Sequence, residues 1–590
     1  MKKLSAVALA AGILTASCAG HGGQTALPPG AGLQNAKTAG AHNNAVAIAA
    51  PSGWSSTATQ GVTVANATNL GALEPSTPMT VRVGLNLHNT DALAHAIASG
   101  QTLTPAQFAA TYGPTPSEVQ AVVSYLQTQG FTNIETGTQM VSANGTAANV
   151  SKAFNTTLNA FSLNGAHVYA NVTPAYVPTN LGGIVTAVLG LTNAAKMAVP
   201  TDYACVKNTN PPNGQCLARF EPADVQRYYD ADPLPPATAT SIAVIAEGDV
   251  SGVVNDLRTA ESVFGLPQVP VTVVNVGLKS PDTAGGGEWA LDTQSSTGMA
   301  QNVKMLYLYV ATSLTDSDIA HTYSKWVGQD LAQTGNSSFG ECEYSAWLDG
   351  AMKVDDNLFM QAAAQGQTMF ASTGDTGSAC AVLPTNGAPG SGPPMVSYPA
   401  DSPYVNAVGG TSVVRNTNDA NYVGEVAWNA GGGGISQFEN ATSWEEPVQL
   451  TTGIVAAGNL RGVPDTAMAA DAEAGAYRVY GTNPGLGDCS AGCSIGGTSE
   501  SSPLTMGAWA RVLSAHGGVA KFAPPLLYQN YTRYESNETL VQGPPPTETY
   551  GGFHDIISGA NGTYTAQPGY DYTTGLGTLD VAQLSKTLTF

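Results

Sequence analysis

A serine that could act as a nucleophile lies in the segment SIGGTSESSPLTMG, residues 494–507. Glycines precede Ser499, and Pro503 is expected to open a helix, since proline is tolerated in a first helical turn. The hydroxyl would then stand on a tight turn at a helix N-terminus. A serine hydroxyl is inert unless a nearby base takes its proton, and the surrounding sequence offers carboxylates rather than a convincing histidine. The pattern therefore indicates serine chemistry that operates in acid.

The tripeptide Gly-Thr-Ser also occurs at Thr411 and Ser412, in AVGGTSVVR, where a strand-like run without proline follows it. The bare tripeptide is therefore weak evidence for a nucleophile. Pro503 and the helical pattern of ESSPLTMGAWARVLSAHGG are the features that favour Ser499 over Ser412.

Glu288 and Asp292 stand four residues apart in GGGEWALDTQSS, so on a helix both carboxyls lie on one face, about one turn apart. Two close carboxylates do not both ionise cheaply, so one keeps a proton and the other accepts one. An unperturbed glutamate titrates at about 4.3, and a glutamate base therefore implies an acidic working pH. Taken alone, the pair could equally be a solvated acidic helix face.

Asp375 follows a predicted strand in FASTGDTGS, residues 370–378. One interpretation is an aspartate that caps a turn. The other is a protonated carboxyl that donates a hydrogen bond to the oxyanion of a tetrahedral intermediate. The second interpretation again requires acid.

Asp555 and Asp571 lie in a glycine-rich segment near the C-terminus, residues 553–577. Two carboxylates with several backbone carbonyls suit calcium. The spacing is not that of an EF-hand, and an ordinary aspartate-rich turn is the alternative.

The order of predicted elements indicates two domains. From Met79 a strand, several helices and a strand over 133–142 form a small α+β unit that ends near Leu191. Beyond residue 235, strands and helices alternate at the spacing of a parallel α/β sheet, and the segments 337–341 and 368–375 are predicted as strands with polar groups at their C-terminal ends. That edge is the usual position of a site in such sheets.

Composition limits the partners and the compartment. The 590 residues carry a net charge of −21 with 11% charged residues, which argues against nucleic acid and anionic membranes as partners. Three N-terminal residues with two lysines precede an apolar run over 6–16, too short to span a bilayer but typical of a secretory signal. Cys18 resembles a bacterial lipoprotein cleavage site imperfectly, so a lipid anchor is an alternative to free secretion.

Six further cysteines form an even set, which favours disulfides in an oxidising compartment. Local spacing makes Cys205 with Cys216 and Cys489 with Cys493 the simplest pairs, which leaves Cys342 to pair with Cys380. A zinc site is the alternative, but no histidine stands at ligand spacing.

Collected together, these residues resemble the sedolisin family of serine-carboxyl peptidases, of the pro-kumamolisin type. The resemblance covers roughly residues 65–590 and includes, in family order, EWALD, STGDTG, YPADSPYVNAVGGTS, EVAWNAGGGGIS, VPDTAMAADA, GTSESSP and GYDYTTGLG. It implies a subtilisin-like parallel sheet flanked by helices, preceded by a smaller α+β prosegment domain that covers the cleft until it is cleaved in acid.

The resemblance also implies roles for individual residues. It makes Ser499 the nucleophile, Glu288 its general base, Asp292 the group that orients Glu288, and Asp375 the oxyanion donor. It implies one calcium ion bound by the side chains of Asp555 and Asp571 and by the carbonyls of Ile556, Gln567 and Gly569. Gln567 stands where the family usually has glycine, and Phe339 where relatives often have tryptophan, so we expect a shorter hydrogen-bond network behind Glu288.

The predicted organisation is a signal peptide over 1–18, a linker over 19–64, an activation prosegment over 65–191, a processing region over 192–216 and a catalytic domain over 217–590. The predicted protein is a secreted, monomeric, acid-active endopeptidase of proteins and peptides, inhibited by its own prosegment, with no transmembrane span. Two alternatives are a silent binding protein of the same fold and a subtilisin-type protease with a histidine base. Against the latter, none of His321, His516 and His554 stands in an HGT setting. Tripeptidyl activity and substrate preference stay open.

Overall fold

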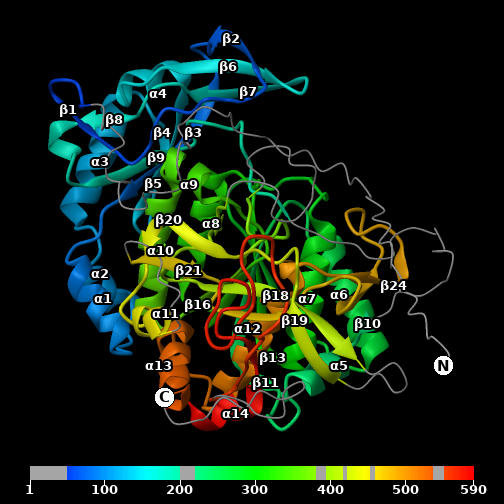
Figure 1. The fold of residues 1–590 in the computed structure, drawn as a ribbon. Helices are drawn as coiled ribbons and strands as arrows, with labels where there is room; N and C mark the ends of the chain where they lie inside the picture. The colour runs from blue at the N-terminus through cyan, green and yellow to red at the C-terminus, as the bar shows by residue number, and fades with distance from the viewer. Residues whose placement is uncertain (1–48, 200–218, 381–393, 416–421, 452–458, 536–550) are drawn as a thin grey trace, which may run out of the picture.

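A mostly parallel sheet forms the centre of the C-terminal part of the molecule in this computed structural model, which describes residues 49–199, 219–380, 394–415, 422–451, 459–535 and 551–590 (Figure 1). Its strands run in the order β12-β13-β11-β14-β16-β18-β22-β26-β25, with β19 paired to β18. Among the strand pairs that the described residues form in this sheet, only β18–β19 and β25–β26 are antiparallel. The strands are β11 (Ala237–Glu247), β12 (Val271–Asn275), β13 (Val303–Ala311), β14 (Thr334–Ser337), β16 (Thr368–Ser372), β18 (Asn406–Arg415), β19 (Tyr422–Ala427), β22 (Thr466–Ala469), β25 (Phe553–His554) and β26 (Thr578–Leu579).

Helices cover this sheet, and smaller sheets surround it. The helices are α5 (Pro222–Tyr228), α6 (Ser251–Phe264), α7 (Gly286–Ala300), α8 (Asp316–Gln329), α9 (Glu343–Asp349), α10 (Ala351–Ala364), α11 (Glu446–Thr451), α12 (Thr498–Ala515), α13 (Ala523–Glu535) and α14 (Val581–Thr587). The smaller sheets contain β10 (Arg219–Phe220), β15 (Glu341–Cys342), β17 (Ser397–Tyr398), β20 (Gly434–Asn440), β21 (Leu460–Val463), β23 (Ala476–Gly481) and β24 (Cys489–Ile495). The architecture confirms the predicted subtilisin-like α/β fold.

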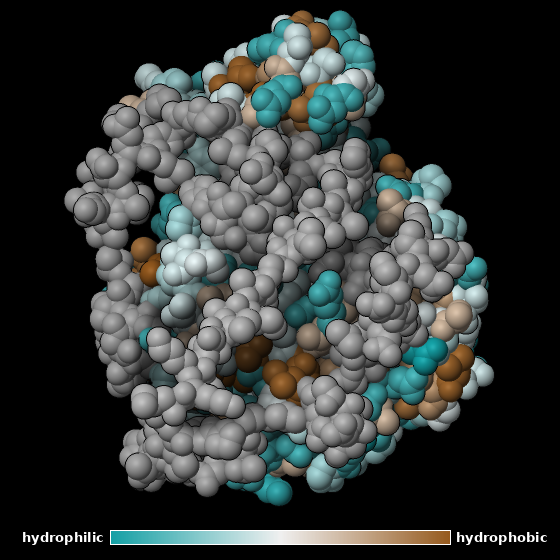
Figure 2. All heavy atoms as spheres, turned by 45° about the vertical axis from the view of Figure 1, so that its right-hand side comes forward, coloured by the Kyte–Doolittle hydropathy of each residue, from teal (hydrophilic) through white to brown (hydrophobic). Residues whose placement is uncertain are grey.

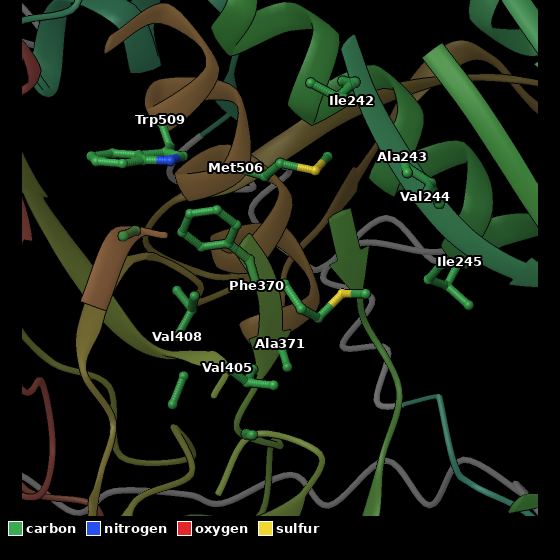
Figure 3. Close-up of a cluster of buried hydrophobic side chains, with 14 of the residues drawn as sticks. Ile242, Ala243, Val244, Ile245, Phe370, Ala371, Val405, Val408, Met506 and Trp509 are labelled. Atoms are coloured by element: carbon green, nitrogen blue, oxygen red, sulfur yellow. The ribbon is translucent and has the colours of Figure 1, made fainter. Parts of the chain in front are cut away.

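The apolar core lies between the sheet and α12, because both present buried faces to each other. Met506 and Trp509 of α12 lie near Phe370 of β16 and Val408 of β18 (Figure 3). Residues 242–246 of β11 are all fully buried, as expected for a central parallel strand covered on both faces. This core fixes α12, and with it the segment that carries Ser499.

The N-terminal part is a separate α+β unit with its own core. Its four-stranded antiparallel sheet has the order β4-β5-β3-β9, and a three-stranded sheet has the order β2-β6-β7. Its elements are β1 (Trp54–Ser56), β2 (Thr68–Ala72), β3 (Pro78–Leu85), α1 (Thr90–Ala98), α2 (Pro105–Thr111), α3 (Pro116–Thr128), β4 (Thr132–Gly137), β5 (Met140–Thr146), α4 (Ala147–Ala153), β6 (Leu158–Leu163), β7 (Ala166–Asn171), β8 (Tyr176–Pro178) and β9 (Val185–Leu189).

Several local predictions need correction. The stretch 133–142 forms two strands, β4 and β5, because Gln139 adopts a positive φ of 56° and turns the chain between them. The predicted strand over 337–341 lies earlier, as β14. The predicted linker over 19–64 is wrong for its last part, since β1 pairs with β8 and Thr59 Oγ1 donates to the carbonyl of Val188 at 3.0 Å. These hydrogen bonds make residues from 54 onward part of the α+β unit.

Two of the three predicted disulfides are present, Cys342–Cys380 and Cys489–Cys493. The predicted signal peptide, Cys18 and the pair Cys205–Cys216 lie outside the described residues. In the described ranges, no helix has the length and apolar character that crossing a membrane would require. Hydrophilic and hydrophobic residues are interspersed over the described part of the face in Figure 2.

Candidate active site

The two carboxyls of α7 are enclosed by protein. Every residue of α7 is buried, with Glu288 1% and Asp292 0% exposed. Helix α7 packs on α12 on one side and contacts α6 and β11 on others. The alternative of a solvated acidic helix face is therefore wrong.

Ser499 is the second residue of α12, and the preceding Gly497 has a φ of 101°. This left-handed backbone region strongly favours glycine, which explains the glycine before the turn. Ser499 is fully buried, and its Oγ donates to the carbonyl of Ser338 at 3.4 Å. The helix begins at Thr498, so the prediction that Pro503 opens it is wrong, and Pro503 lies inside the helix.

A chain of hydrogen bonds that we did not predict connects α12 with Asp292. Ser502 Oγ donates to Asn336 Oδ1 at 2.6 Å, and Asn336 Nδ2 donates to Ser338 Oγ at 2.9 Å. Ser338 Oγ lies 2.6 Å from Asp292 Oδ1, to which it donates, and 3.3 Å from the carbonyl oxygen of Ser499. The only feature of the sequence that indicated this hydrogen-bond chain was the polar C-terminal end of the strand predicted over 337–341.

Burial raises the pKa of Asp292 well above its ordinary value, because a buried carboxylate loses its hydration. The hydrogen bonds from Ser338 and Asn336 act in the opposite direction. The second oxygen of Asp292 accepts no hydrogen bond from any described residue. In acid this carboxyl therefore carries a proton that it can share with a neighbour.

Asp375 lies beside the residue that precedes Ser499. The backbone N–H and the hydroxyl of Thr498 donate to Asp375 Oδ1 at 2.8 and 2.9 Å. The N–H of Gly374 in turn donates to Thr498 Oγ1 at 3.0 Å. Asp375 is half-buried at the C-terminal end of β16, so the site lies at the sheet edge that the sequence predicted.

An aromatic pair includes Trp289, the residue that follows Glu288 in α7. Phe339 packs edge-on against Trp289, with ring centroids 6.0 Å apart. Phe339 has no side-chain hydrogen-bonding group, whereas Trp289 Nε1 donates to the carbonyl of Glu247 at 3.0 Å. Burial and the nearby charge of Asp282 raise the pKa of Glu247 to about 7. Glu247 is a titratable group close to the site that sequence reasoning missed.

The residues predicted to bind calcium lie together in one loop. Asp555 Oδ2 accepts from the N–H of Gly569 at 2.9 Å, and Asp571 Oδ2 accepts from the N–H of Gln567 at 3.0 Å. Ile556 directly follows Asp555. Asp571 is fully buried, and burial raises its pKa. Two carboxylates held in one loop supply oxygen donors of the kind that calcium accepts.

The histidines lie elsewhere. His516 donates through Nε2 to the carbonyl of Ser585 at 2.9 Å. His516 follows Ser499 by seventeen residues, which places it about 25 Å away along the helix. His321 belongs to α8 and faces the α+β unit, and His554 ends β25 next to Asp230. These positions give no support to the histidine-base alternative.

Two family descriptions match the chain. Residues 65–194 match the activation domain of pro-kumamolisin, and residues 281–542 match the subtilase family. These ranges fall on the α+β unit and on the α/β domain respectively.

Similar proteins extend over both parts. The chain is 36% identical to xanthomonalisin from Xanthomonas sp. (strain T-22) in an alignment 578 positions long that covers 87% of this chain and 66% of that protein. It is 35% identical to sedolisin from Pseudomonas sp. (strain 101) in an alignment 516 positions long that covers 82% of this chain and 81% of that protein. The solved structure of Pseudomonas sedolisin, a serine-carboxyl proteinase complexed with two molecules of pseudo-iodotyrostatin, matches with a TM-score of 0.54 and 32% identity. It covers 62% of this chain and 97% of that one.

Proposed function

This chain belongs to the sedolisin family of serine-carboxyl peptidases, and from that premise we propose that it is a secreted endopeptidase that works in acid on proteins and peptides. Family membership makes it a serine-type peptidase with an N-terminal pro-domain. The observation that carries the finer proposal is the hydroxyl of Ser338, which joins Asp292 to the backbone of Ser499 within a fully buried network. The acid requirement follows from the carboxyls that replace histidine.

In the proposed reaction, Glu288 accepts the proton of Ser499 Oγ as this oxygen attacks the peptide carbonyl. Asp292 orients Glu288 and shares a proton with it, since the two buried carboxyls do not both ionise cheaply. Protonated Asp375 donates a hydrogen bond to the oxyanion of the tetrahedral intermediate. Glu288 then gives its proton to the departing amine, which leaves an acyl-enzyme on Ser499. Water, activated by the same glutamate, releases the acyl group and restores the serine.

The α+β unit is proposed to act as an intramolecular inhibitor. The segment that leaves it pairs with the catalytic domain, where the N–H of Ala198 donates to the carbonyl of Gly340 at 2.8 Å and the N–H of Gly340 donates back at 3.1 Å. Gly340 lies two residues after Ser338, whose carbonyl accepts from Ser499. The segment that follows the prosegment therefore occupies an edge where a substrate backbone could pair, and cleavage after Ala198 within 192–216 would free it.

We further propose one structural calcium ion in the loop that holds Asp555 and Asp571. Those two side chains and the carbonyls of Ile556, Gln567 and Gly569 would hold it. The ion would supply positive charge that compensates the buried carboxylate of Asp571. Removal of calcium with a chelator should lower the melting temperature of the wild type. It should leave the melting temperature of Asp571→Asn almost unchanged, and an equal effect on both would refute the site.

The nucleophile is tested with the two Gly-Thr-Ser copies as a matched pair. Purified zymogens carrying Ser499→Ala or Ser412→Ala are brought to about pH 4, near the ordinary pKa of glutamate, and prosegment removal and protein cleavage are followed. We expect both events to be lost with Ser499→Ala and retained with Ser412→Ala. Cleavage by Ser499→Ala at the wild-type rate would refute this role. A wild type that stays inert after its prosegment is removed would favour the silent binding protein.

A further inference from the structure

Three side chains outside the proposed active site and calcium loop converge at the lower part of the molecule. Asp230 follows α5, His554 ends β25, and Asp580 is the N-cap of α14. One potential ligand atom from each lies within 4.8 Å of the other two. Figure 1 shows α5 and α14 in the lower part of the view. Because the residues come from separate parts of the chain, their meeting is a product of the tertiary fold.

His554 is buried but is not committed to a hydrogen bond with either carboxylate. The residue is 3% exposed, and its Nδ1 has no hydrogen-bond partner among the described residues. Its Nε2 points at Asp230 Oδ2 from 3.8 Å, which is longer than a hydrogen bond. The nitrogen nearest to Asp230 is Nε2, and it makes no hydrogen bond of ordinary length to that carboxylate. Nε2 is therefore available to a ligand that sits between the ring and the carboxylates.

The two carboxylates carry like charge at close range. The pKa of Asp230 is raised by partial burial and by the charge of Asp580. In the described ranges, neither forms a salt bridge with a lysine or an arginine. Asp580 Oδ1 accepts from the N–H of Gln583 at 2.8 Å, and its other oxygen remains for a ligand. A cation would offset this repulsion.

The backbone holds the two acidic residues in place. The N–H of Val581 donates to the carbonyl of Tyr229 at 2.9 Å, and the N–H of Ala582 donates to the carbonyl of Asp230 at 3.1 Å. These bonds dock the start of α14 on the end of α5. The carboxylates are consequently positioned without any ion, and only their side chains need to move on binding.

We propose that Asp230, His554 and Asp580 bind one divalent transition-metal ion of the zinc type. One imidazole nitrogen and two carboxylate oxygens are ligands that such ions accept, at about 2.0–2.2 Å, with water in the fourth position. Ligand atoms of a tetrahedral site are then about 3.4 Å apart, so the observed span closes by rotation of the exposed Asp230 side chain. The ion would connect the end of α5, the first helix after the processing region, to the start of α14.

Binding is tested on the Ser499→Ala zymogen, whose prosegment stays attached, in excess calcium so that the calcium loop is filled. Cobalt(II) is titrated and followed by its visible absorption, and zinc is titrated by calorimetry. We expect one ion per chain and a higher melting temperature. Asp230→Asn and Asp580→Asn should each weaken binding at least tenfold, and asparagine preserves the cap at position 580.

Asp232→Asn is the matched control, since Asp232 is an exposed carboxylate close enough to act on Asp230 but outside the group of three. It should bind cobalt and zinc like the parent. Absence of stoichiometric binding in the parent would overturn the proposal. So would equal affinity in the Asp230 and Asp580 variants, because the metal would then be elsewhere.

Discussion

Pro503 lies four residues after Ser499 within α12, and this spacing removes the helical partner of the Ser499 carbonyl. In a helix that carbonyl would accept from the N–H of residue 503, but proline has none. Ser338 Oγ lies 3.3 Å from the Ser499 carbonyl oxygen instead, while also contacting Asp292. The proline thus permits a link between the helix of the serine and the buried carboxyl.

Ser338→Ala should lower kcat/KM by roughly 10- to 100-fold, because the proposed sharing of one proton leaves one negative charge on the pair of Glu288 and Asp292, and a hydrogen bond to a charged group contributes about 1.5–3 kcal/mol. The bond from Ser338 lowers the pKa of Asp292, so its loss should move the limb of the pH–rate profile that reports this carboxyl to higher pH. Steady-state kinetics across the acid range measure both effects. Ser337→Ala is the control, since that buried hydroxyl bonds to Tyr323 and not to a carboxylate. Equal losses in both variants would indicate a packing effect.

Asp375→Asn should lower kcat but flatten the decline of activity towards neutral pH. In the proposed reaction the wild type loses its oxyanion donor when the carboxyl ionises, whereas the amide of asparagine donates at every pH. The asparagine oxygen can still accept from Thr498, which contacts Asp375 Oδ1 in the wild type. Comparison of the two pH–rate profiles tests this. An unchanged profile would remove Asp375 from the oxyanion role.

His321→Gln should make prosegment release in acid roughly tenfold slower. Burial lowers the pKa of His321 from 6.5 to about 4, with the charge of Arg82 acting in the same direction. The imidazole of His321 therefore binds a proton more readily in the free catalytic domain than in the zymogen. The contact between α8 and the α+β unit consequently weakens as the pH falls from about 6.5 to about 4. We expect only a tenfold change in the rate of prosegment release because His321 is partly exposed and solvent screens its charge.

The charged groups around His321 come from both sides of the contact. It lines a cavity of about 620 Å³ with Glu135 of β4 and Lys325 of α8. Arg82 of β3 forms an ion pair of 2.8 Å with Asp318 of α8, a further charged contact between the two units. His167→Gln, at an exposed position, is the control for the rate of processing measured on gels. A wild-type rate in His321→Gln would rule out this contribution.

Replacement of Cys342 and Cys380 by serine should reduce the free energy of unfolding by about 4 kcal/mol. The estimate is the chain entropy of a closed loop for a separation of 38 residues. The pair Cys489–Cys493, separated by 4 residues, should contribute about 2 kcal/mol by the same relation. Urea unfolding of the two double variants makes the comparison. A larger loss from the short loop would contradict the entropic account.

Local patterns allowed much of the fold to be predicted. The alternation of apolar residues in 79–87 and the strand–helix rhythm after residue 235 gave the two domains, since periodicity reports which face of an element is buried. The predicted boundaries of elements were wrong where a single backbone angle ends a strand, as at Gln139. They were also wrong where a glycine lets a helix begin earlier than predicted, as at Thr498.

The sequence by itself determined the family, through the order of its motifs, and the lack of a suitably placed histidine predicts carboxyls as the partners of Ser499. Only the tertiary structure decided how those carboxyls are held. Ser338 and Asn336 lie far in the chain from both α7 and α12, and the three residues of the proposed metal site span positions 230 to 580. Burial and hydrogen bonding depend on which distant segments meet, and no local pattern carries that information.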